Sequence, residues 1–129
     1  MPIAEVIYYC EADGSVPVLD WLKELARRDP RAAEKCVARI DVLRGLGHEA
    51  RRPIADYLRD GIYELRTRVG RVQYRILFFF HGQNAVVLAH GLTKEREVPP
   101  IDIKRALNRK KAFEKAPKRH TYRKESSDG

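Results

Sequence analysis

Residues Gly61 to Lys94, GIYELRTRVGRVQYRILFFFHGQNAVVLAHGLTK, decide the fold of this chain. Three runs rich in Tyr, Ile, Val, Leu and Phe are separated by Val69-Gly70 and by the residues HGQN at 81–84. Apolar runs of this length, interrupted by turn residues, are typical of consecutive antiparallel strands. We therefore expect a meander of three strands.

In the first two of these strands, polar and apolar side chains alternate, and the two-residue period of a strand gives each kind its own face. The polar face carries Glu64, Arg66 and Arg68 on the first strand and Arg71, Gln73 and Arg75 on the second. The third run is apolar until His90, and Lys94 follows four residues later. We expect one apolar face and one face, or end, lined with Arg, Glu, His and Lys, which is the candidate site.

The chain has 129 residues, which fits one domain with a modest core. Its net charge is +8, and residues 104–129 hold ten Lys and Arg against three Asp and Glu. A basic excess attracts polyanions such as nucleic acid, although a solvated helix with a disordered tail has the same composition. Cys10 and Cys36 lack a metal-like spacing, which indicates buried, reduced thiols. With neither a signal peptide nor a membrane span in the pattern, we expect a cytoplasmic protein.

The other segments are expected to supply one more strand and three helices. Residues Ile3 to Cys10 should form a strand. A helical hairpin should follow, its first helix capped by Ser15 and its second beginning at Asp29-Pro30. We expect a short turn of helix at 55–59 and a basic helix at about 101–116.

This order, β-α-α-β-β-β-α, predicts a small α+β domain over residues 1–116. The domain should be an antiparallel sheet with the helical hairpin packed on one face and a basic C-terminal helix. Residues 117–129 have little apolar content, and we expect a basic, disordered tail there. The pattern shows neither an internal repeat nor a second domain.

The sequence G-I-Y-E-L-R…G-R-V-Q-Y-R-I, followed by L-A-H-G-L-T-K…P-P-I-D-I-K-R-A-L-N-R, resembles the RelE/ParE toxin superfamily, and most of all its HigB-like, phage-derived branch. The resemblance covers residues 3–115. It implies a RelE-like domain with a concave basic surface opposite the helical hairpin, acting as the toxin of a type II toxin–antitoxin pair. Most such toxins cleave mRNA in the ribosomal A site without a metal ion, whereas the ParE branch inhibits DNA gyrase. The implied partners are the ribosome, mRNA and a helix-turn-helix antitoxin in a hetero-oligomer; no cofactor or membrane is implied.

The resemblance also implies site residues. Arg75 matches the arginine that contacts the scissile phosphate, and Glu64 and Arg66 fall where many relatives carry basic catalytic residues. His90 falls where some HigB-like members place a histidine. The catalytic residues implied in this way are Arg75, Arg66, Lys94, His90 and Glu64. The chain departs from the family in the acidic Glu64 and in lacking the C-terminal tyrosine that some relatives stack on a base.

Metal-free RNA cleavage needs a base for the 2′-OH, cations for the charge on phosphorus, and an acid for the leaving 5′-oxygen. Arg75 and Arg66 suit the second role, because a guanidinium grips phosphate oxygens in bidentate fashion. His90, Glu64 and Lys94 all remain candidates for the base. In the alternative interpretation, Glu64 only forms a cross-strand ion pair with Arg75, and His90 only hydrogen-bonds a turn.

Further cations are expected to hold RNA through its phosphates. They are Arg68, Arg71, Arg96, Lys104, Arg105, Arg109 and Lys110. Three functions remain open: an mRNA endoribonuclease, a non-enzymatic toxin that binds gyrase, and a plain RNA-binding module. Titratable groups beside arginines favour the first over the second. The third needs base-stacking aromatic residues on the basic face, but Tyr63 and Tyr74 are expected on the apolar face.

Overall fold

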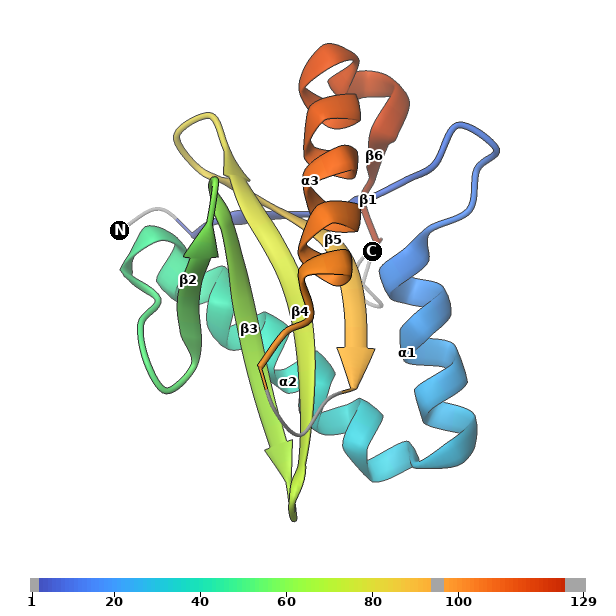
Figure 1. The fold of residues 1–129 in the computed structure, drawn as a ribbon, viewed down its shortest axis with the longest axis vertical. Coiled ribbons are helices and arrows are strands. Elements are labelled where there is room, and N and C mark those ends of the chain that lie inside the picture. The colour runs from blue at the N-terminus through green and yellow to red at the C-terminus, as the bar shows by residue number, and fades with distance from the viewer. Residues whose placement is uncertain (1–2, 94–96, 125–129) are drawn as a thin grey trace.

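The computed structural model describes residues 3–93 and 97–124 of the chain (Figure 1). The helices in this part of the chain are α1 (Pro17–Arg28), α2 (Pro30–Leu46) and α3 (Pro100–Lys115), with 3₁₀ turns η1 (Gly47–Glu49) and η2 (Pro117–His120). The strands are β1 (Glu5–Tyr9), β2 (Ala55–Arg59), β3 (Ile62–Val69), β4 (Val72–His81), β5 (Ala85–Thr93) and β6 (Thr121–Tyr122).

A single sheet lies between two layers of helices. Its strand order is β2-β3-β4-β5-β1-β6, with β1 parallel to β5 and the other neighbours antiparallel. The α1–α2 hairpin packs on one face, and α3 lies across the other, in front of the sheet in Figure 1. The predicted α+β class, the meander and the position of the helical hairpin are confirmed. The sheet is not wholly antiparallel, because β1 reaches β5 by a long crossover rather than by a tight turn.

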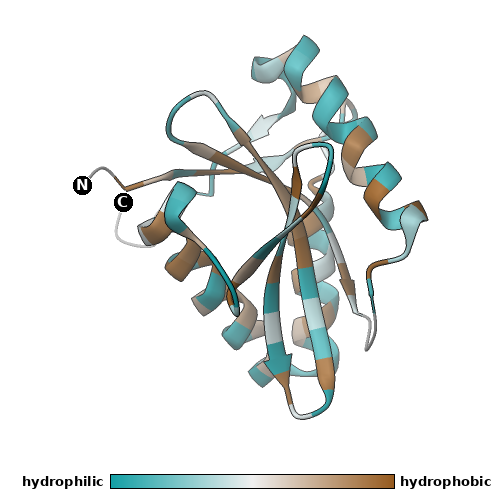
Figure 2. Cartoon of the chain, turned by 60° about the vertical axis from the view of Figure 1, so that its left-hand side comes forward, coloured by the Kyte–Doolittle hydropathy of each residue, from teal (hydrophilic) through white to brown (hydrophobic). Residues whose placement is uncertain are grey.

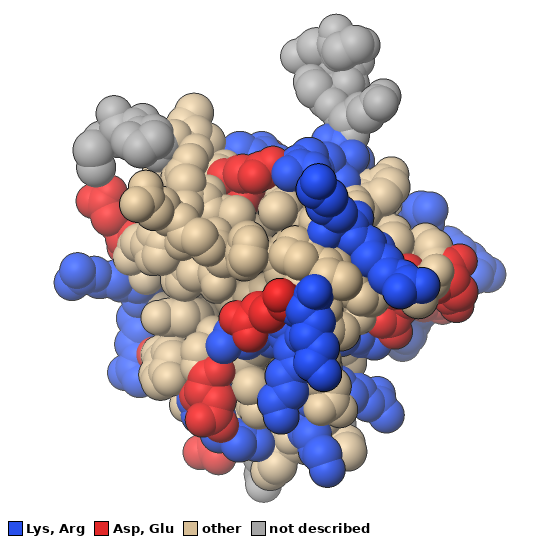
Figure 3. Space-filling model, turned by 90° about the horizontal axis from the view of Figure 1, so that it is seen from above, with Lys and Arg blue, Asp and Glu red and all other residues tan. Residues whose placement is uncertain are grey.

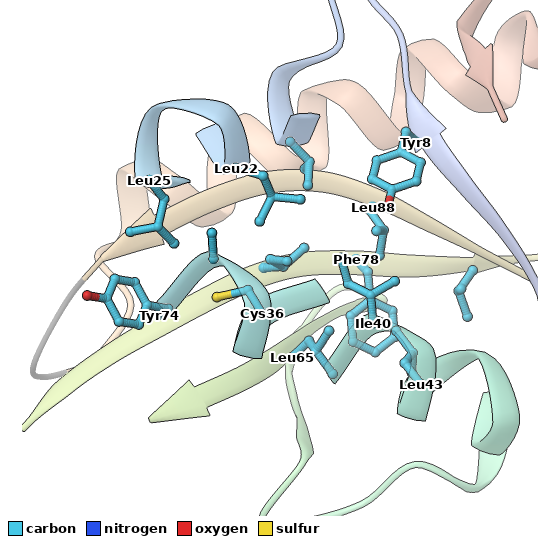
Figure 4. Packing of buried hydrophobic residues seen from close by; sticks show 14 of the residues in the cluster. Tyr8, Leu22, Leu25, Cys36, Ile40, Leu43, Leu65, Tyr74, Phe78 and Leu88 are labelled. Atoms are coloured by element: carbon cyan, nitrogen blue, oxygen red, sulfur yellow. The ribbon is translucent and has the colours of Figure 1, made fainter. Parts of the chain in front are cut away.

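The larger core lies between the sheet and the α1–α2 hairpin. Its central side chains are Leu22 and Leu25 from α1, Cys36, Ile40 and Leu43 from α2, and Leu65, Tyr74, Phe78 and Leu88 from the sheet (Figure 4). Apolar residues three or four positions apart bring the helical members onto one stripe of each helix, as the sequence predicts. Fully burying one such side chain stabilises the fold by about 1.5–3 kcal/mol.

The two helices of this hairpin begin differently. At the start of α2, the carboxylate of Asp29 accepts the N–H of Ala32 at 3.1 Å, which confirms the predicted cap. The predicted Ser15 cap of α1 is wrong. That helix begins at Pro17, and the N–H of Ser15 donates to Asp13 Oδ1 at 2.9 Å. Ser15 therefore belongs to the turn that precedes the helix.

A second core fills most of the opposite face, beneath α3. It includes Ile62, Leu77, Phe79 and Val87 from the sheet and Ile103, Ala106 and Phe113 from α3. Along β4 this face changes from polar at Arg75 to apolar at Leu77 and Phe79, and Figure 2 shows teal and white bands mainly toward the tip of the β3–β4 hairpin. The expected concave basic surface is therefore wrong for most of this face, because the apolar side chains need cover and α3 supplies it.

Residues Ala55–Arg59 form strand β2, and the predicted turn of helix is wrong. The strand pairs with β3, with Ala55 opposite Leu65 and Tyr57 opposite Tyr63. Ala, Leu and Arg favour helices locally, but one isolated helical turn is unstable, and pairing with β3 satisfies the backbone instead.

Residues 117–122 are ordered, so the predicted disordered tail is wrong for this part. They form η2 and β6, and β6 pairs antiparallel with β1. His120 is only 9% exposed; its Nδ1–H donates to the carbonyl of Cys10 at 2.7 Å, and its ring stacks on Tyr9 at 5.1 Å. The N–H of Cys10 returns a bond to the carbonyl of His120 at 2.9 Å. The amino-acid composition of this segment did not indicate the contact, because it depends on a single histidine. Residues 125–129 lie outside the described residues.

We expect His120→Ala to lower the free energy of unfolding by about 1–3 kcal/mol, because the change removes a buried hydrogen bond and a stacked ring. The measurement is urea denaturation followed by circular dichroism. Lys118→Ala, at an exposed position of η2, serves as the control and should change stability little. Equal stability of the two variants would show that this segment does not support the fold.

Gly91 marks a close approach of α1 to the sheet. A Cβ at this position would lie 2.4 Å from Cδ2 of Trp21. The indole also meets the ring of Tyr74 edge-on, with centroids 6.4 Å apart. The missing side chain therefore leaves the space that the ring of Trp21 occupies beside β5.

We expect Gly91→Ala to destabilise the protein by about 1–3 kcal/mol, because the added methyl overpacks the contact with Trp21. Gly45→Ala is the matched control, since Gly45 is inside α2 and a Cβ added there would have nothing within 4 Å. It should stabilise the helix by about 0.5–1 kcal/mol. Thermal denaturation of both variants checks the opposite signs, and a harmless Gly91→Ala would refute the close approach.

Candidate functional site

Glu64, Arg66 and Arg75 meet on adjacent strands β3 and β4, and we call this group the arginine cluster. Arg66 lies directly opposite Arg75, and Arg75 Nη1 donates to Glu64 Oε1 at 2.7 Å. Both partners are buried, since Arg75 is 8% exposed and Glu64 is 4% exposed. The ion pair of the alternative interpretation is therefore present. It is buried, and breaking such a pair is costly because one charge is left without a partner.

The arginine cluster has more cationic donors than its own acceptors satisfy. Within the described residues, the Nε atoms of Arg66 and Arg75 are buried and have no hydrogen-bond partner. Two guanidinium groups on directly opposed strand positions repel each other, and one carboxylate neutralises only one of them. An anion with several oxygens would satisfy these donors and offset the excess charge once the arginine side chains turn to expose the two buried N–H groups.

The carboxyl group of Glu64 is electrostatically unusual. Burial raises its pKa, while the nearby Arg75 and Arg66 oppose this rise. Asp56 on β2 lies directly opposite Glu64 in the strand register, and its negative charge raises the pKa of Glu64 further. A carboxyl group whose pKa is shifted toward neutrality is a better proton acceptor than an ordinary exposed glutamate.

His90 is not part of the arginine cluster. In the register of the sheet, Leu77 lies between Glu64 on β3 and His90 on β5. An irregular register between β4 and β5 at this point accompanies the turn of His90 toward α3, where its Nε2 lies 2.7 Å from Asp102 Oδ1. The predicted grouping of His90 with the catalytic arginines is therefore wrong, and an apolar side chain separates them.

Both ring nitrogens of His90 are occupied. Nη1 of Arg109 lies 3.2 Å from Nδ1 of His90 and also donates to the carbonyl of Ala89 at 2.7 Å. Because a guanidinium only donates, Nδ1 is the acceptor and the proton on Nε2 is donated to Asp102. In this arrangement His90 has no free nitrogen for a substrate proton. It fastens α3 to β5.

Burial lowers the pKa of His90, with Arg109 and Arg105 acting in the same direction and Asp102 opposing them. The unfolded chain therefore protonates this histidine at a higher pH than the folded protein does. The stability that neutral His90 contributes should be present near pH 7 and should be lost as pH falls below about 6.5.

We expect His90→Gln to destabilise the protein most at about pH 8 and least at about pH 5, because the wild type loses stability on acidification and the variant has no group to charge there. Urea denaturation across this range measures the difference, with Asn108→Gln, at an exposed position of α3, as the control. A difference that grows toward low pH would instead mean that charged His90 pairs with Asp102.

The cations predicted to hold RNA fall into three groups. Arg109 and Lys110 are half-buried and engaged: Arg109 contacts His90 and lies over Tyr9 at 5.9 Å, and Lys110 Nζ donates to Asp60 O at 3.5 Å. Their role in RNA binding stays a prediction, and it would require these side chains to leave or share their present partners. The exposed members are Arg68, Arg71, Lys104 and Arg105. Lys94 and Arg96 lie outside the described residues.

The cations do not form one continuous field on the face drawn in Figure 3. Lys and Arg side chains make short streaks with carboxylates and uncharged surface between them. A nucleic acid held there would contact separate groups of cations. In the arginine cluster, by contrast, two guanidinium groups are held next to each other by adjacent strands.

Sequence reasoning missed two acidic neighbours of the site. Asp56 lies in the segment expected to be helical, so its position opposite Glu64 in a strand pair could not be predicted. Asp102 lies in the first turn of α3, where an acidic residue commonly offsets the helix dipole, and this ordinary role gave no hint of a bond to His90. Among the described residues, no group of three or more His, Cys, Asp or Glu is placed to hold a metal ion.

Two comparisons bear on the family. A family model described as Phage derived protein Gp49-like matches residues 20–111, which run from the first turn of α1 through most of α3 and include the whole arginine cluster. A search of the curated proteins finds no match. None of the helices among the described residues has the length and apolar character that a membrane crossing requires.

Proposed function

The chain belongs to the Gp49-like family of phage-derived proteins, a family of toxin-like proteins, and on this premise we propose that it is the toxin of a type II toxin–antitoxin pair. We assign it to the RelE/HigB-like toxins, as an endoribonuclease that cleaves mRNA on the ribosome without a metal ion. Its partner is a helix-turn-helix antitoxin, in a hetero-oligomer, in the cytoplasm. The observation that carries the proposal is the pair of buried Nε atoms in the arginine cluster, which have no hydrogen-bond partner among residues 3–93 and 97–124.

The proposed reaction uses the arginine cluster directly. The scissile phosphate binds between Arg66 and Arg75, whose side chains turn so that their buried Nε–H groups donate to its oxygens. Glu64, whose pKa is raised by burial, takes the proton of the 2′-OH, and the 2′-oxygen attacks phosphorus. The bond to the 5′-oxygen breaks, and an acid protonates this oxygen, which leaves a 2′,3′-cyclic phosphate and a 5′-OH. The two guanidinium groups stabilise the charge that develops on phosphorus.

The acid of this reaction remains a sequence-based prediction. His90 is unsuited, because Asp102 and Arg109 occupy its two nitrogens. Lys94 remains the candidate and lies outside the described residues. The alternative functions, gyrase binding and RNA binding without chemistry, give the raised pKa of Glu64 no chemical role and leave this residue only as the ion-pair partner of Arg75.

The test uses one variant that keeps the buried charges balanced and one that removes the charge of the carboxylate while keeping its shape. Arg75→Ala would strand buried Glu64, so the decisive variants are Arg75→Lys, which keeps the charge, and Glu64→Gln, which keeps an acceptor for Arg75. We expect each to lower the rate of mRNA cleavage on programmed ribosomes by roughly 100- to 1000-fold, the size of effect seen for one lost charge-stabilising group.

Arg27→Ala is the control for cleavage, since Arg27 is exposed on α1, on the opposite side of the sheet. A melting curve for each variant separates loss of rate from loss of fold. Cleavage at the wild-type rate by folded Arg75→Lys and Glu64→Gln would reduce the cluster to a structural ion pair and would overturn the proposed reaction. Unaltered translation under strong expression of the wild type would overturn the toxin assignment itself.

A further inference from the structure

We infer that Tyr57, on the edge strand β2, is a stacking platform for one base of a single-stranded RNA, and that Arg51 beside it takes a phosphate of the same strand. This inference rests on the proposed ribonuclease function and adds a binding site outside the arginine cluster. It places the RNA across the free edge of the sheet, next to the strand that carries Glu64 and Arg66.

Tyr57 is exposed yet fixed. The residue is 53% exposed, although apolar and aromatic side chains fill both faces of the sheet beside it. Its hydroxyl oxygen accepts the N–H of Gly61 at 3.1 Å, and Tyr63 meets its ring edge-on with centroids 5.0 Å apart. A ring held at both ends loses little freedom when a base stacks on it, so stacking there costs less than on a mobile side chain.

The cations beside this ring are arranged for a phosphate. A cleft of about 420 Å³ adjoins Tyr57 and is lined by Arg51, Arg52, Asp56 and Tyr63. Arg52 is held by Asp56, with Nε and Nη2 each 2.9 Å from Oδ2. Arg51 is exposed and has no ion-pair partner among residues 3–93 and 97–124. One guanidinium is thus paired and one is open to a ligand anion.

The strand register connects this cleft to the arginine cluster. Asp56 precedes Tyr57 and lies opposite Glu64, and the N–H of Arg66 donates to the carbonyl of Ile54 at 2.8 Å. The Tyr57 ring lies on the hairpin side of the sheet, with Tyr63, whereas the cluster lies on the α3 side. Since β2 is the last strand on its side of the described sheet, an RNA strand can pass over this edge from one to the other.

The chemistry of the cleft favours RNA over a protein partner. Tyr and Arg also occur at protein hot spots, but such hot spots lie in a fully desolvated apolar centre, and the aliphatic members of this lining are only the methyl groups of Ala50 and Ala55. A flat aromatic ring next to a free guanidinium is the combination that single-stranded nucleic acid binders use. Binding of a protein at the cleft is therefore the competing result that the experiment must distinguish from RNA binding.

The test measures RNA binding without cleavage. The probe is a short fluorescein-labelled oligoadenylate whose riboses are 2′-O-methylated, so that the proposed reaction cannot occur. Fluorescence anisotropy gives Kd for the wild type, Tyr57→Ser, Tyr57→Phe and Tyr122→Ser. Tyr122 is the matched control, because it is 39% exposed at the opposite edge of the sheet.

We expect Tyr57→Ser to raise Kd by about 5- to 150-fold, the loss of one stacked base, and Tyr57→Phe to bind nearly as the wild type does. Tyr122→Ser should be unchanged. A second probe with abasic sugars throughout should bind the wild type and Tyr57→Ser equally, because only phosphate contacts remain. Arg51→Ala should weaken both probes and lower the salt dependence of binding.

Several outcomes would overturn the inference. They are a wild type that does not bind the probe, an unchanged Kd in Tyr57→Ser, an equal loss in Tyr122→Ser, or a loss that persists on the abasic probe. Unchanged RNA binding together with weaker association with the antitoxin would assign the cleft to a protein. A negative binding result would not change the interpretation of the cleavage assay of the arginine cluster. A negative cleavage result would likewise leave this binding measurement valid, so each proposal can be refuted without the other.

Discussion

The burial of β4 on both faces is the constraint on which the rest of the structure depends. Tyr74, Ile76 and Phe78 point into the core beneath the α1–α2 hairpin, while Leu77 and Phe79 point into the core beneath α3. A strand that is apolar on both sides must be covered twice, so the fold needs two helical layers and not one. The position of α3 follows from this requirement. Because α3 covers that face of the sheet, it also buries much of the face that carries the polar residues.

The same burial determines the character of the arginine cluster. Arg75 belongs to β4, so its guanidinium lies at the boundary where the second core ends, 8% exposed. A charge in that position needs a partner, and Glu64 on β3 provides it at 2.7 Å. The pair neutralises one of the two opposed guanidinium groups, and within the described part of the chain each group keeps a donor without a partner. The ion pair that the fold requires and the free donors that could bind a substrate therefore belong to the same three residues.

Much of the fold could be read from the sequence, because the signals were periodic. The alternation in 63–68 and 71–76 correctly separates Glu64, Arg66 and Arg75 from Tyr63, Leu65 and Tyr74, and helical spacing correctly places the apolar stripes of α1 and α2. What could not be read depends on contacts between distant segments. The strand at Ala55–Arg59 exists because β3 is beside it, and the ordered end of the chain exists because His120 meets Cys10. The separation of His90 from the cluster depends on Leu77 and on Asp102, whose position no local pattern specifies.

The place of β1 in the sheet has a consequence for how the chain folds. This strand lies near the start of the chain, yet its two neighbours are β5 and β6, which come near the end of the described residues. Neither pairing can form until almost the whole chain has collapsed, and closing such long loops costs entropy before any strand contact repays it. The β2–β5 meander, built from local turns, is therefore expected to assemble first. Until β1 docks, β5 presents an apolar open edge, and this slow last step is the period in which the chain is most exposed to aggregation.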